Sequence, residues 1–283
     1  MMTTAAANTP HEAFSKRLVE TPAPHDTERA KSLLQDIIDG LRDDDQRSRL
    51  QALLAETMVT DLVLGTLGCS PYLTGLIRQE PARLLRILEC VPERYMAELI
   101  EKLGRDVTGA ANLSEAMPLL RRFKSEMALL IALCDLGGVW PIMTVTAALT
   151  ATADAAVSAC VGFLFAQAVA KGEWLADGEH PESQSGYIVI AMGKHGAREL
   201  NYSSDIDLVV FYDPEKSRLK PGRELPMFFI RMTRDLVKLM QERTADGYVF
   251  RTDLRLRPDP GATQVAISFG SAMHYYETVG QNW

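Results

Sequence analysis

Two carboxylates stand two residues apart in a short apolar run of this 283-residue chain. The run reads Asp205-Ile-Asp-Leu-Val-Val-Phe-Tyr212 and has the length and β-branched content of a strand. Alternation along a strand places Asp205 and Asp207 on one face, roughly 7 Å apart. Such a pair suits Mg²⁺, which binds one or two carboxylates and leaves room for phosphate oxygens. An Asp-x-Asp at a strand start is also compatible with simple turn chemistry, so the pair alone decides nothing.

A third carboxylate, Asp253, lies in a segment that alternates polar and apolar residues from Tyr248 to Arg257. The alternation predicts a strand with Asp253 on the same face as Arg251, Arg255 and Arg257. If this strand neighbours the first, three carboxylates converge beside a row of arginines. Two like charges ~6 Å apart repel by about 2.8 kcal/mol at an effective dielectric near 20, so the cluster requires counter-charge. A surface ladder of ion pairs is the competing interpretation.

A glycine turn, Met192-Gly-Lys-His-Gly196, follows a predicted strand at Tyr187–Ala191. Backbone amides of Gly193 to Gly196 are placed to approach phosphate oxygens closely. The turn imitates part of the dinucleotide-binding fingerprint. However, only the 11 residues 194–204 separate it from the strand at Asp205, and a parallel crossover needs a dozen or more. The spacing therefore excludes a Rossmann fold.

The elements that position these residues suggest an α+β protein. Residues 1–26 contain Pro10, Pro22 and Pro24 and are expected to form a mobile tail. Residues 27–172 show helical periodicity throughout and predict a helical domain. The clearest helix there runs from Ser114 to Leu136, with Arg121, Arg122 and Lys124 expected in solvent. Residues 173–283 predict a small α/β domain, whose helix carries apolar residues at helical spacing from Leu225 to Met240.

Composition narrows the class of protein. The net charge of −7 disfavours a nucleic-acid binder. The four cysteines form no CxxC pair and are interpreted as reduced core residues, and the N-terminus lacks the apolar region of a signal peptide. The most apolar stretch, Ala155–Ala170, has 16 residues and is shorter than the ~20 needed to cross a bilayer. These features predict a cytoplasmic protein with neither a nucleic-acid nor a membrane partner.

A longer pattern carries a family resemblance. A glycine turn followed by Asp-hydrophobic-Asp, with a third Asp on a later strand, resembles the nucleotidyltransferase fold of DNA polymerase β type, a small mixed sheet with helices. The strings Gly193-Lys-His-Gly-Ala-Arg-Glu-Leu-Asn-Tyr-Ser-Ser-Asp-Ile-Asp207 and Phe250-Arg-Thr-Asp-Leu-Arg-Leu-Arg-Pro258 look like the glutamine synthetase adenylyltransferase/adenylyl-removing enzyme family. The segments Leu120–Gly137 and His274–Trp283 also match that pattern, so the resemblance covers roughly residues 55–283. Lys194, His195 and Ala197 depart from the usual residues.

The resemblance implies a site and a reaction. Asp205, Asp207 and Asp253 would be the catalytic residues and the ligands of two Mg²⁺ ions. Phosphate or nucleotide would contact the residues Gly193, Lys194, Ser204, Arg251 and Arg255. The text Asn201-Tyr-Ser-Ser-Asp-Ile-Asp207 is similar to the half of the family that removes AMP from glutamine synthetase by phosphorolysis, giving ADP. The implied partners are glutamine synthetase, a PII-type signalling protein, ATP, ADP and phosphate.

Three other functions remain open at this stage. The same fold can add AMP to glutamine synthetase from ATP, or act on a small-molecule or nucleic-acid hydroxyl. It can also persist as a regulatory domain without chemistry, although the presence of all three carboxylates argues against this. Family members carry two transferase domains, and this chain carries the text of one, so we expect it to be a fragment that is truncated on its C-terminal side.

Overall fold

The chain folds into two compact units that differ from the predicted domains. A computed structural model describes residues 11–175, 178 and 180–280. One unit contains residues up to 99 together with 125–148, and the other contains 100–124 together with 149–283. Residues 100–124 and 149–172, assigned from sequence to the helical domain, thus belong to the same unit as the sheet. The predicted boundary between 172 and 173 is not where the chain divides by compactness.

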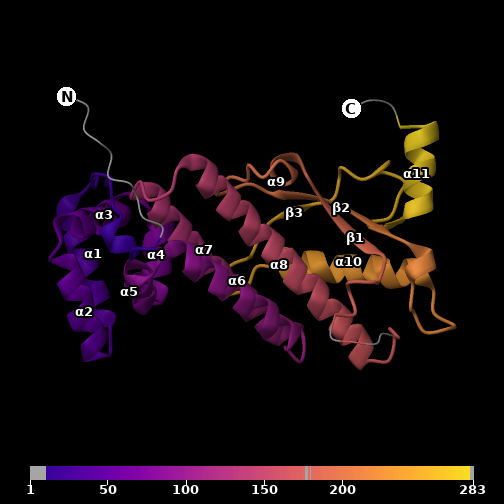
Figure 1. Cartoon of the computed structure of the whole chain (residues 1–283), viewed down its shortest axis with the longest axis horizontal. Helices are drawn as coiled ribbons and strands as arrows, with labels where there is room; N and C mark the ends of the chain where they lie inside the picture. Colours follow the sequence, from indigo (N-terminus) through magenta and orange to yellow (C-terminus); the bar gives the residue numbers. More distant parts are fainter. Residues whose placement is uncertain (1–10, 176–177, 179, 281–283) are drawn as a thin grey trace. The chain divides into compact units, whose positions relative to one another are not determined.

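The first unit is helical, and its helices start where the sequence places turn residues (Figure 1). Pro71 and Pro81 stand in the first turn of their helices, where a missing N–H costs nothing. Asp26 and Ser70 cap helices by accepting a backbone N–H. The elements are η1 (Phe14–Lys16), α1 (Thr27–Gly40), α2 (Asp44–Leu54), α3 (Thr57–Cys69), α4 (Pro71–Gln79), α5 (Pro81–Glu89), and parts of α6 (Pro92–Thr108), α7 (Leu113–Leu136) and α8 (Ile142–Ala170).

Residues 11–26 do not form the predicted mobile tail. Phe14 is fully buried, and its N–H donates to the carbonyl of Cys90 at 2.7 Å. Gly65 of α3 leaves no room for a Cβ, which would stand 1.9 Å from the carbonyl oxygen of Pro22. The segment therefore packs on the helices of its unit. The remainder of the predicted tail, residues 1–10, lies outside the described residues.

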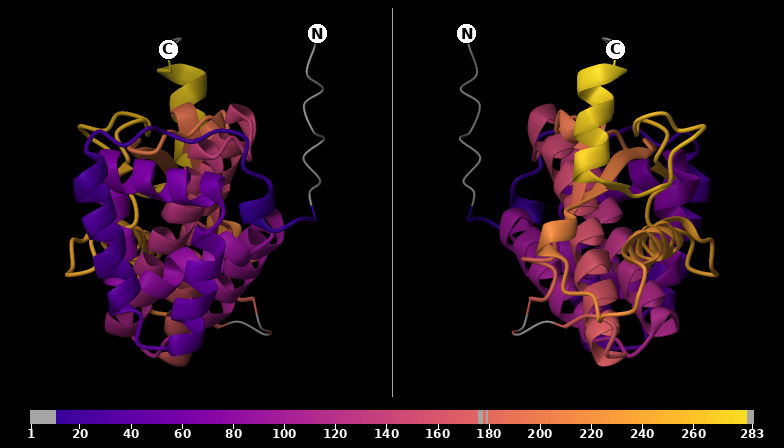
Figure 2. Two further views of the ribbon diagram at one scale, coloured as in Figure 1. Left: turned by 90° about the vertical axis from the view of Figure 1, so that its left-hand side faces the viewer. Right: turned by 90° about the vertical axis from the view of Figure 1, so that its right-hand side faces the viewer.

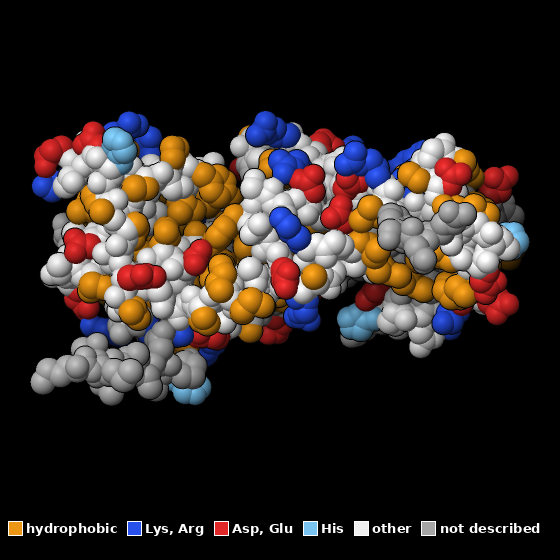
Figure 3. Space-filling view, turned by 90° about the horizontal axis from the view of Figure 1, so that it is seen from above, with side chains coloured by type: hydrophobic (Ala, Val, Ile, Leu, Met, Phe, Trp, Pro, Cys, Tyr) orange, Lys and Arg blue, Asp and Glu red, His pale blue; other side chains and the backbone are white. Residues whose placement is uncertain are grey.

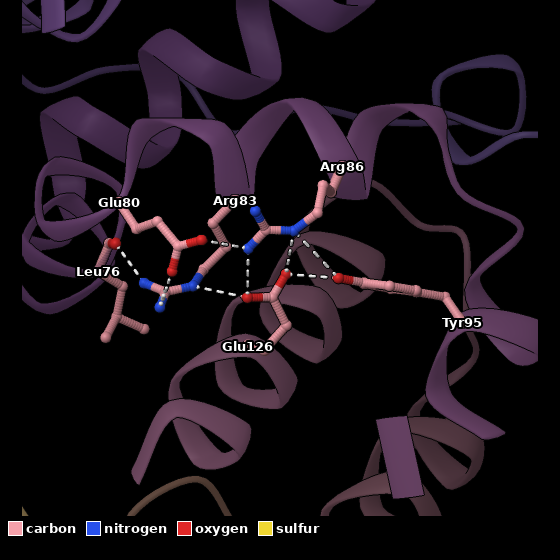
Figure 4. Close-up of polar contacts among 6 residues, drawn as sticks. All are labelled: Leu76, Glu80, Arg83, Arg86, Tyr95 and Glu126. Carbon is pink, nitrogen blue, oxygen red and sulfur yellow. Dashed lines mark hydrogen bonds and ion pairs between the residues drawn. The ribbon is translucent and has the colours of Figure 1, made fainter. Parts of the chain in front are cut away.

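A buried polar network joins α5, α6 and α7 (Figure 4). Glu126 accepts from Arg83 Nε at 2.9 Å, from Arg86 Nη2 at 2.9 Å and from the hydroxyl of Tyr95 at 2.7 Å. Arg83 also donates to the carbonyl of Leu76 at 2.5 Å, and Glu80 accepts from both arginines. A buried carboxylate is tolerated only when its charge and lone pairs are matched. Here two guanidinium groups and a phenol satisfy it.

The second unit carries a four-stranded mixed sheet, which confirms the α+β class. Strand β1 is antiparallel to β2, as the short connection between them requires, whereas β3 and β4 both pair parallel to β2. The sheet order is β1-β2-β3, with β4 also beside β2. The elements are β1 (Tyr187–Met192), α9 (Gly193–Gly196), β2 (Ile206–Tyr212), η2 (Pro214–Lys216), α10 (Leu225–Gln241), β3 (Thr252–Asp253), β4 (Ile267–Ser268) and α11 (Phe269–Thr278).

Helix α10 packs on one face of the sheet through aromatic rings. Phe229 stacks on Tyr212 with ring centroids 4.7 Å apart and on Tyr187 at 5.5 Å. The hydroxyls of Tyr187 and Thr233 are hydrogen-bonded at 2.8 Å. On the other face, Val209 and Phe211 pack with Ile267 and Ala272. The inward-facing residues predicted for β2 (Ile206, Leu208 and Val210) are all buried.

Helix α11 is largely exposed to solvent. Ala272 is its one buried residue, and the helix extends beyond the other elements of its unit (Figures 1 and 2). Figure 3 shows hydrophobic side chains on the surface of the protein, seen from above. The exposed large apolar residues of α11 and its C-terminal cap are Phe269, Met273, Tyr276 and Val279.

Helix α8 is longer than the sequence suggested. It spans 29 residues rather than the 16 of the apolar stretch, so by length and composition it is one helix that could cross a membrane. However, 56% of its most apolar window is buried inside the protein. The side chains that cover it give α8 the character of a core helix. The four cysteines are free thiols; Cys134 and Cys160 are buried as predicted, whereas Cys69 is exposed.

Arg121 of α7 was expected in solvent but is buried. Its guanidinium donates to the carbonyls of Met117 at 3.1 Å, Leu239 at 3.2 Å and Gly247 at 3.1 Å, and also to that of Glu242. Three of these acceptors lie at the end of α10 and in the turn that follows it. Because terminal helix carbonyls have no partner within the helix, Arg121 supplies the donors that they lack.

We expect Arg121→Ala to destabilise the second unit strongly. The substitution removes the arginine donor from the carbonyls of Leu239 and Glu242 and empties its buried site, which should lower the free energy of unfolding by about 3 kcal/mol. Arg122→Ala removes an exposed neighbour of the same charge and should change it by under ~0.5 kcal/mol. Urea unfolding of both variants measures the difference. Equal midpoints for the two variants would contradict the structural role of Arg121.

Candidate active site

Strands β2 and β3 bring the predicted carboxylates together at one end of the sheet. Asp207 is paired in register with Asp253, and Asp205 directly precedes β2. The N–H of Ile206 donates to the carbonyl of Arg251 at 2.9 Å, which continues the ladder by one step. Partial burial raises the pKa of Asp207, and the charges of Asp253 and Asp205 raise it further. The expected crowding of three carboxylates is therefore confirmed.

The predicted strand from Tyr248 to Arg257 is wrong in extent, since only Thr252 and Asp253 form β3. After Asp253 the chain turns, and the N–H of Arg255 donates back to its carboxylate at 2.8 Å. Arg257 does not line the carboxylate face. It donates to the carbonyls of Leu254 at 2.7 Å and Pro260 at 2.8 Å, and so braces the loop that follows β3.

Arg251 and Arg255 are paired with the carboxylates. Arg251 Nε lies 2.7 Å from Asp205 Oδ1, and Arg255 Nε lies 2.9 Å from Asp253 Oδ2. The hydrogen bonds from Arg255 lower the pKa of Asp253. The side chain of Arg255 is 83% exposed and that of Arg251 is 53% exposed. Solvent screens exposed ion pairs and makes them weak, so both guanidinium groups can change partners at little cost.

The glycine turn packs directly against the second carboxylate. Gly193 has φ +55°, and a Cβ there would stand 2.6 Å from Asp207 Oδ2. At Gly196 a Cβ would stand 2.5 Å from the carbonyl oxygen of Ala191. Both positions therefore require glycine. Lys194 is exposed on this turn, and Ser204 is half-buried immediately before Asp205, so their predicted phosphate contacts remain a prediction.

Sequence reasoning missed three residues near this site. His195 was noted only as a departure, yet it is buried and hydrogen-bonded to Asp154 of α8. Lys124 was expected in solvent, but its Nζ lies 3.9 Å from the ring centroid of Phe250, and burial lowers its pKa to about 8. No local signal marks Asp154 or Lys124, because each acts on a segment that is distant in sequence.

The donor chemistry of the site fits a divalent cation. Within the described ranges, no three His, Cys, Asp or Glu side chains are arranged as a ready group of metal ligands. Two of the three carboxylates are turned toward arginines instead. Asp207 is the carboxylate of the three that has no arginine partner within the described part of the chain; burial raises its pKa, and the charges of Asp253 and Asp205 raise it further. Oxygen-only donors with excess negative charge are what Mg²⁺ prefers.

A surface cavity of about 580 Å³ lies elsewhere, at the opposite end of β1 and β2. Its lining comes from residues 182–184, 186–188 and 215–218 and includes none of the predicted site residues. The crowded carboxylates, not this cavity, therefore mark the candidate active site.

We expect Asp207→Asn to leave the melting temperature equal or higher at pH 7 in metal-free buffer. A raised pKa means that ionisation of Asp207 opposes folding. The stability linked to it is complete below the unfolded pKa, near 3.9, and is lost as the pH rises through the folded value. The gap between variant and wild type should therefore close below about pH 4.

Asp253→Asn provides the control of opposite sign. Because the pKa of Asp253 is lowered, its contribution is present above the unfolded pKa and is lost as the pH falls. This variant should melt lower at neutral pH, by a small amount because the pair is exposed. Thermal melts across the acid range measure both. A clear loss of stability in Asp207→Asn at pH 7 would indicate a structural hydrogen bond instead of charge repulsion.

Comparison with known proteins places the chain in a family. The family described as glutamate-ammonia ligase adenylyltransferase matches residues 61–283. A bifunctional glutamine synthetase adenylyltransferase/adenylyl-removing enzyme of Bradyrhizobium sp. strain BTAi1 is 46% identical over 284 residues, covering 100% of this chain and 29% of that protein.

Proteins of the same name show similar agreement. That of Xanthobacter autotrophicus is 47% identical over 266 residues, with 93% of this chain and 27% of the relative covered. That of Rhodopseudomonas palustris strain CGA009 is 52% identical over 215 residues, with 76% and 22% covered. This chain thus spans 22–29% of the length of these relatives. It belongs to the glutamate-ammonia ligase adenylyltransferase family.

Proposed function

We propose that this chain is a metal-dependent nucleotidyltransferase domain that removes AMP from adenylylated glutamine synthetase. Inorganic phosphate is the attacking group, and ADP and the unmodified tyrosine are the products. The observation that carries the proposal is the register pair of Asp207 and Asp253 beside the Gly193 turn. Family membership supports the reaction class, and the relatives are named for adding and removing adenylyl groups.

The carboxylates would hold the metal. Asp207 pairs in register with Asp253 and lies two residues after Asp205, so Asp205, Asp207 and Asp253 together would bind Mg²⁺. Bound there, Mg²⁺ would neutralise phosphate oxygens and stabilise an in-line displacement. The glycine turn brings backbone groups to the edge of the same carboxylate. Ser204 and Lys194 flank this point in sequence and would contact phosphate.

The arginines support phosphate as the nucleophile. Free phosphate carries about two negative charges near neutral pH and needs cationic neighbours. Arg251 and Arg255 are exposed and form ion pairs with Asp205 and Asp253, respectively. In the reaction a phosphate oxygen forms a bond to the phosphorus of AMP as the bond to the tyrosine oxygen breaks, and that oxygen takes up a proton. A tyrosine nucleophile, with a pKa near 10, would instead require a base.

The remaining parts of the proposal follow from the family. A PII-type signalling protein would regulate the whole enzyme, and the enzyme would act in the cytoplasm. ATP would be the AMP donor if the reaction ran toward adenylylation. The sequence of residues 201–207 supports the removal of AMP as the direction of the reaction.

We expect phosphate-dependent ADP release from adenylylated glutamine synthetase in the presence of Mg²⁺. Arg251→Ala and Arg255→Ala should each raise the KM for phosphate roughly tenfold, equivalent to about 1.4 kcal/mol. Arg234→Ala removes an exposed arginine of α10 and should leave the KM unchanged. Initial rates of ADP formation at varied phosphate measure this.

Two outcomes would contradict the proposed direction or chemistry. AMP transfer from ATP onto unmodified glutamine synthetase, without phosphate-dependent release, would reverse the direction. No reaction in either direction, with the fold intact, would indicate a regulatory domain.

A further inference from the structure

The glycine turn contains one buried polar side chain. His195 is 3% exposed, although Gly193, Lys194 and Gly196 around it are exposed. Its Nε2 lies 2.8 Å from Asp154 Oδ1 of α8, and its Nδ1 is buried without a hydrogen-bond partner. A buried imidazole nitrogen without a partner is costly, so an apolar side chain would fill this space more favourably. Packing of the space between α8 and the turn therefore does not by itself explain why a histidine stands at position 195.

A second contact attaches the same loop to α8. The N–H of Leu200 donates to Thr150 Oγ1 at 3.4 Å, and Leu200 is fully buried. Thr150 and Asp154 are four residues apart and thus share one face of α8. Both ends of the loop from 195 to 200 are therefore hydrogen-bonded to one face of α8, His195 to Asp154 and Leu200 to Thr150.

The opposite side of the turn faces the carboxylates. A Cβ added at Gly193 would stand 2.6 Å from Asp207 Oδ2, and one added at Gly196 would stand 2.5 Å from the carbonyl oxygen of Ala191. The turn is therefore enclosed between α8 and the end of β1 and β2. With only four residues, α9 has too few internal hydrogen bonds to hold its own position. A displacement of the turn moves its backbone groups relative to Asp207.

We propose that Asp154 is a positioning residue for the glycine turn and acts through His195; the effect on phosphate rests on the proposed function, which assigns phosphate binding to this turn. Its carboxylate accepts the Nε2–H of His195 and fixes the ring in the gap between α8 and the turn. Without that acceptor, both imidazole nitrogens are buried without partners, and the ring moves toward water and takes the turn with it. Asp154 itself is half exposed and touches neither the three carboxylates nor any group placed in the reaction.

The test is a double-mutant cycle on the full chain, with Asp154→Ala, His195→Leu and both together. Asp154→Ala should lower the melting temperature and raise the KM for phosphate roughly tenfold, with a smaller change in kcat. In the His195→Leu background, the same substitution should change neither quantity, because no buried nitrogen needs an acceptor. Asp154→Asn keeps an acceptor oxygen and should restore most of the wild-type KM. Ser158→Ala, on an exposed position one turn further along α8, is the matched control.

Hydrogen exchange gives a reading that does not need the reaction. Asp154→Ala should accelerate amide exchange in residues 193–200 and leave β1 and α10 unchanged. If the wild type shows no phosphorolysis, the proposed function is wrong. Hydrogen exchange and the melting temperatures of the double-mutant cycle still test the role of Asp154 in that case.

Three results would overturn the positioning role. Equal effects of Asp154→Ala in both backgrounds would show that it does not act through His195. A lower melting temperature with an unchanged KM would make the pair structural only. Unchanged exchange at residues 193–200 would show that the turn does not depend on it.

Discussion

Three carboxylates at one end of a small sheet repel one another, and this repulsion determines which residues can surround them. Burial and the charges of its two neighbours raise the pKa of Asp207, whereas the hydrogen bonds from Arg255 lower the pKa of Asp253. The turn begins with glycine because Gly193 has φ +55°, and the carboxylate of Asp207 lies in the space that a side chain at position 193 would enter. The volume of the Asp207 carboxylate thus favours glycine in the neighbouring turn, and the negative charge of the cluster favours arginines beside it.

The sheet itself is too small to hold these groups, since β3 contains two residues. Their placement comes from the helices. Arg121 binds carbonyls at the end of α10 and in the turn at Gly247. The carbonyl of Met240 then accepts from the N–H groups of Val249 at 2.9 Å and Phe250 at 3.1 Å, which sets the path into β3. A buried arginine in α7 therefore holds the segment that leads into β3 and Asp253, although it is more than a hundred residues away in sequence.

The sequence predicted what depends on local pattern. β1, β2 and α10 follow apolar periodicity, and the 11-residue connection between the turn and Asp205 was enough to exclude a parallel crossover, in agreement with the antiparallel pair that β1 and β2 form. Where partners are distant, local pattern failed. Alternation from Tyr248 onward continued past the point where Asp253 captures the N–H of Arg255 and ends the strand. The local sequence does not show that Arg121 and His195 are buried. Their roles become visible only in the structure, where Arg121 meets backbone carbonyls and His195 meets the carboxylate of Asp154.

The arginine pairs connect the two roles predicted for the site. A guanidinium that donates to Asp205 or Asp253 cannot offer the same N–H groups to a phosphate. A cation that binds these carboxylates removes the need for the arginines there, and both are exposed enough to turn away. Arg251 and Arg255 would then become free donors at the edge of the metal site, where an anion arrives. Metal binding and phosphate binding should accordingly favour each other, because the same positive charges serve the carboxylates in the empty site and the phosphate in the filled one.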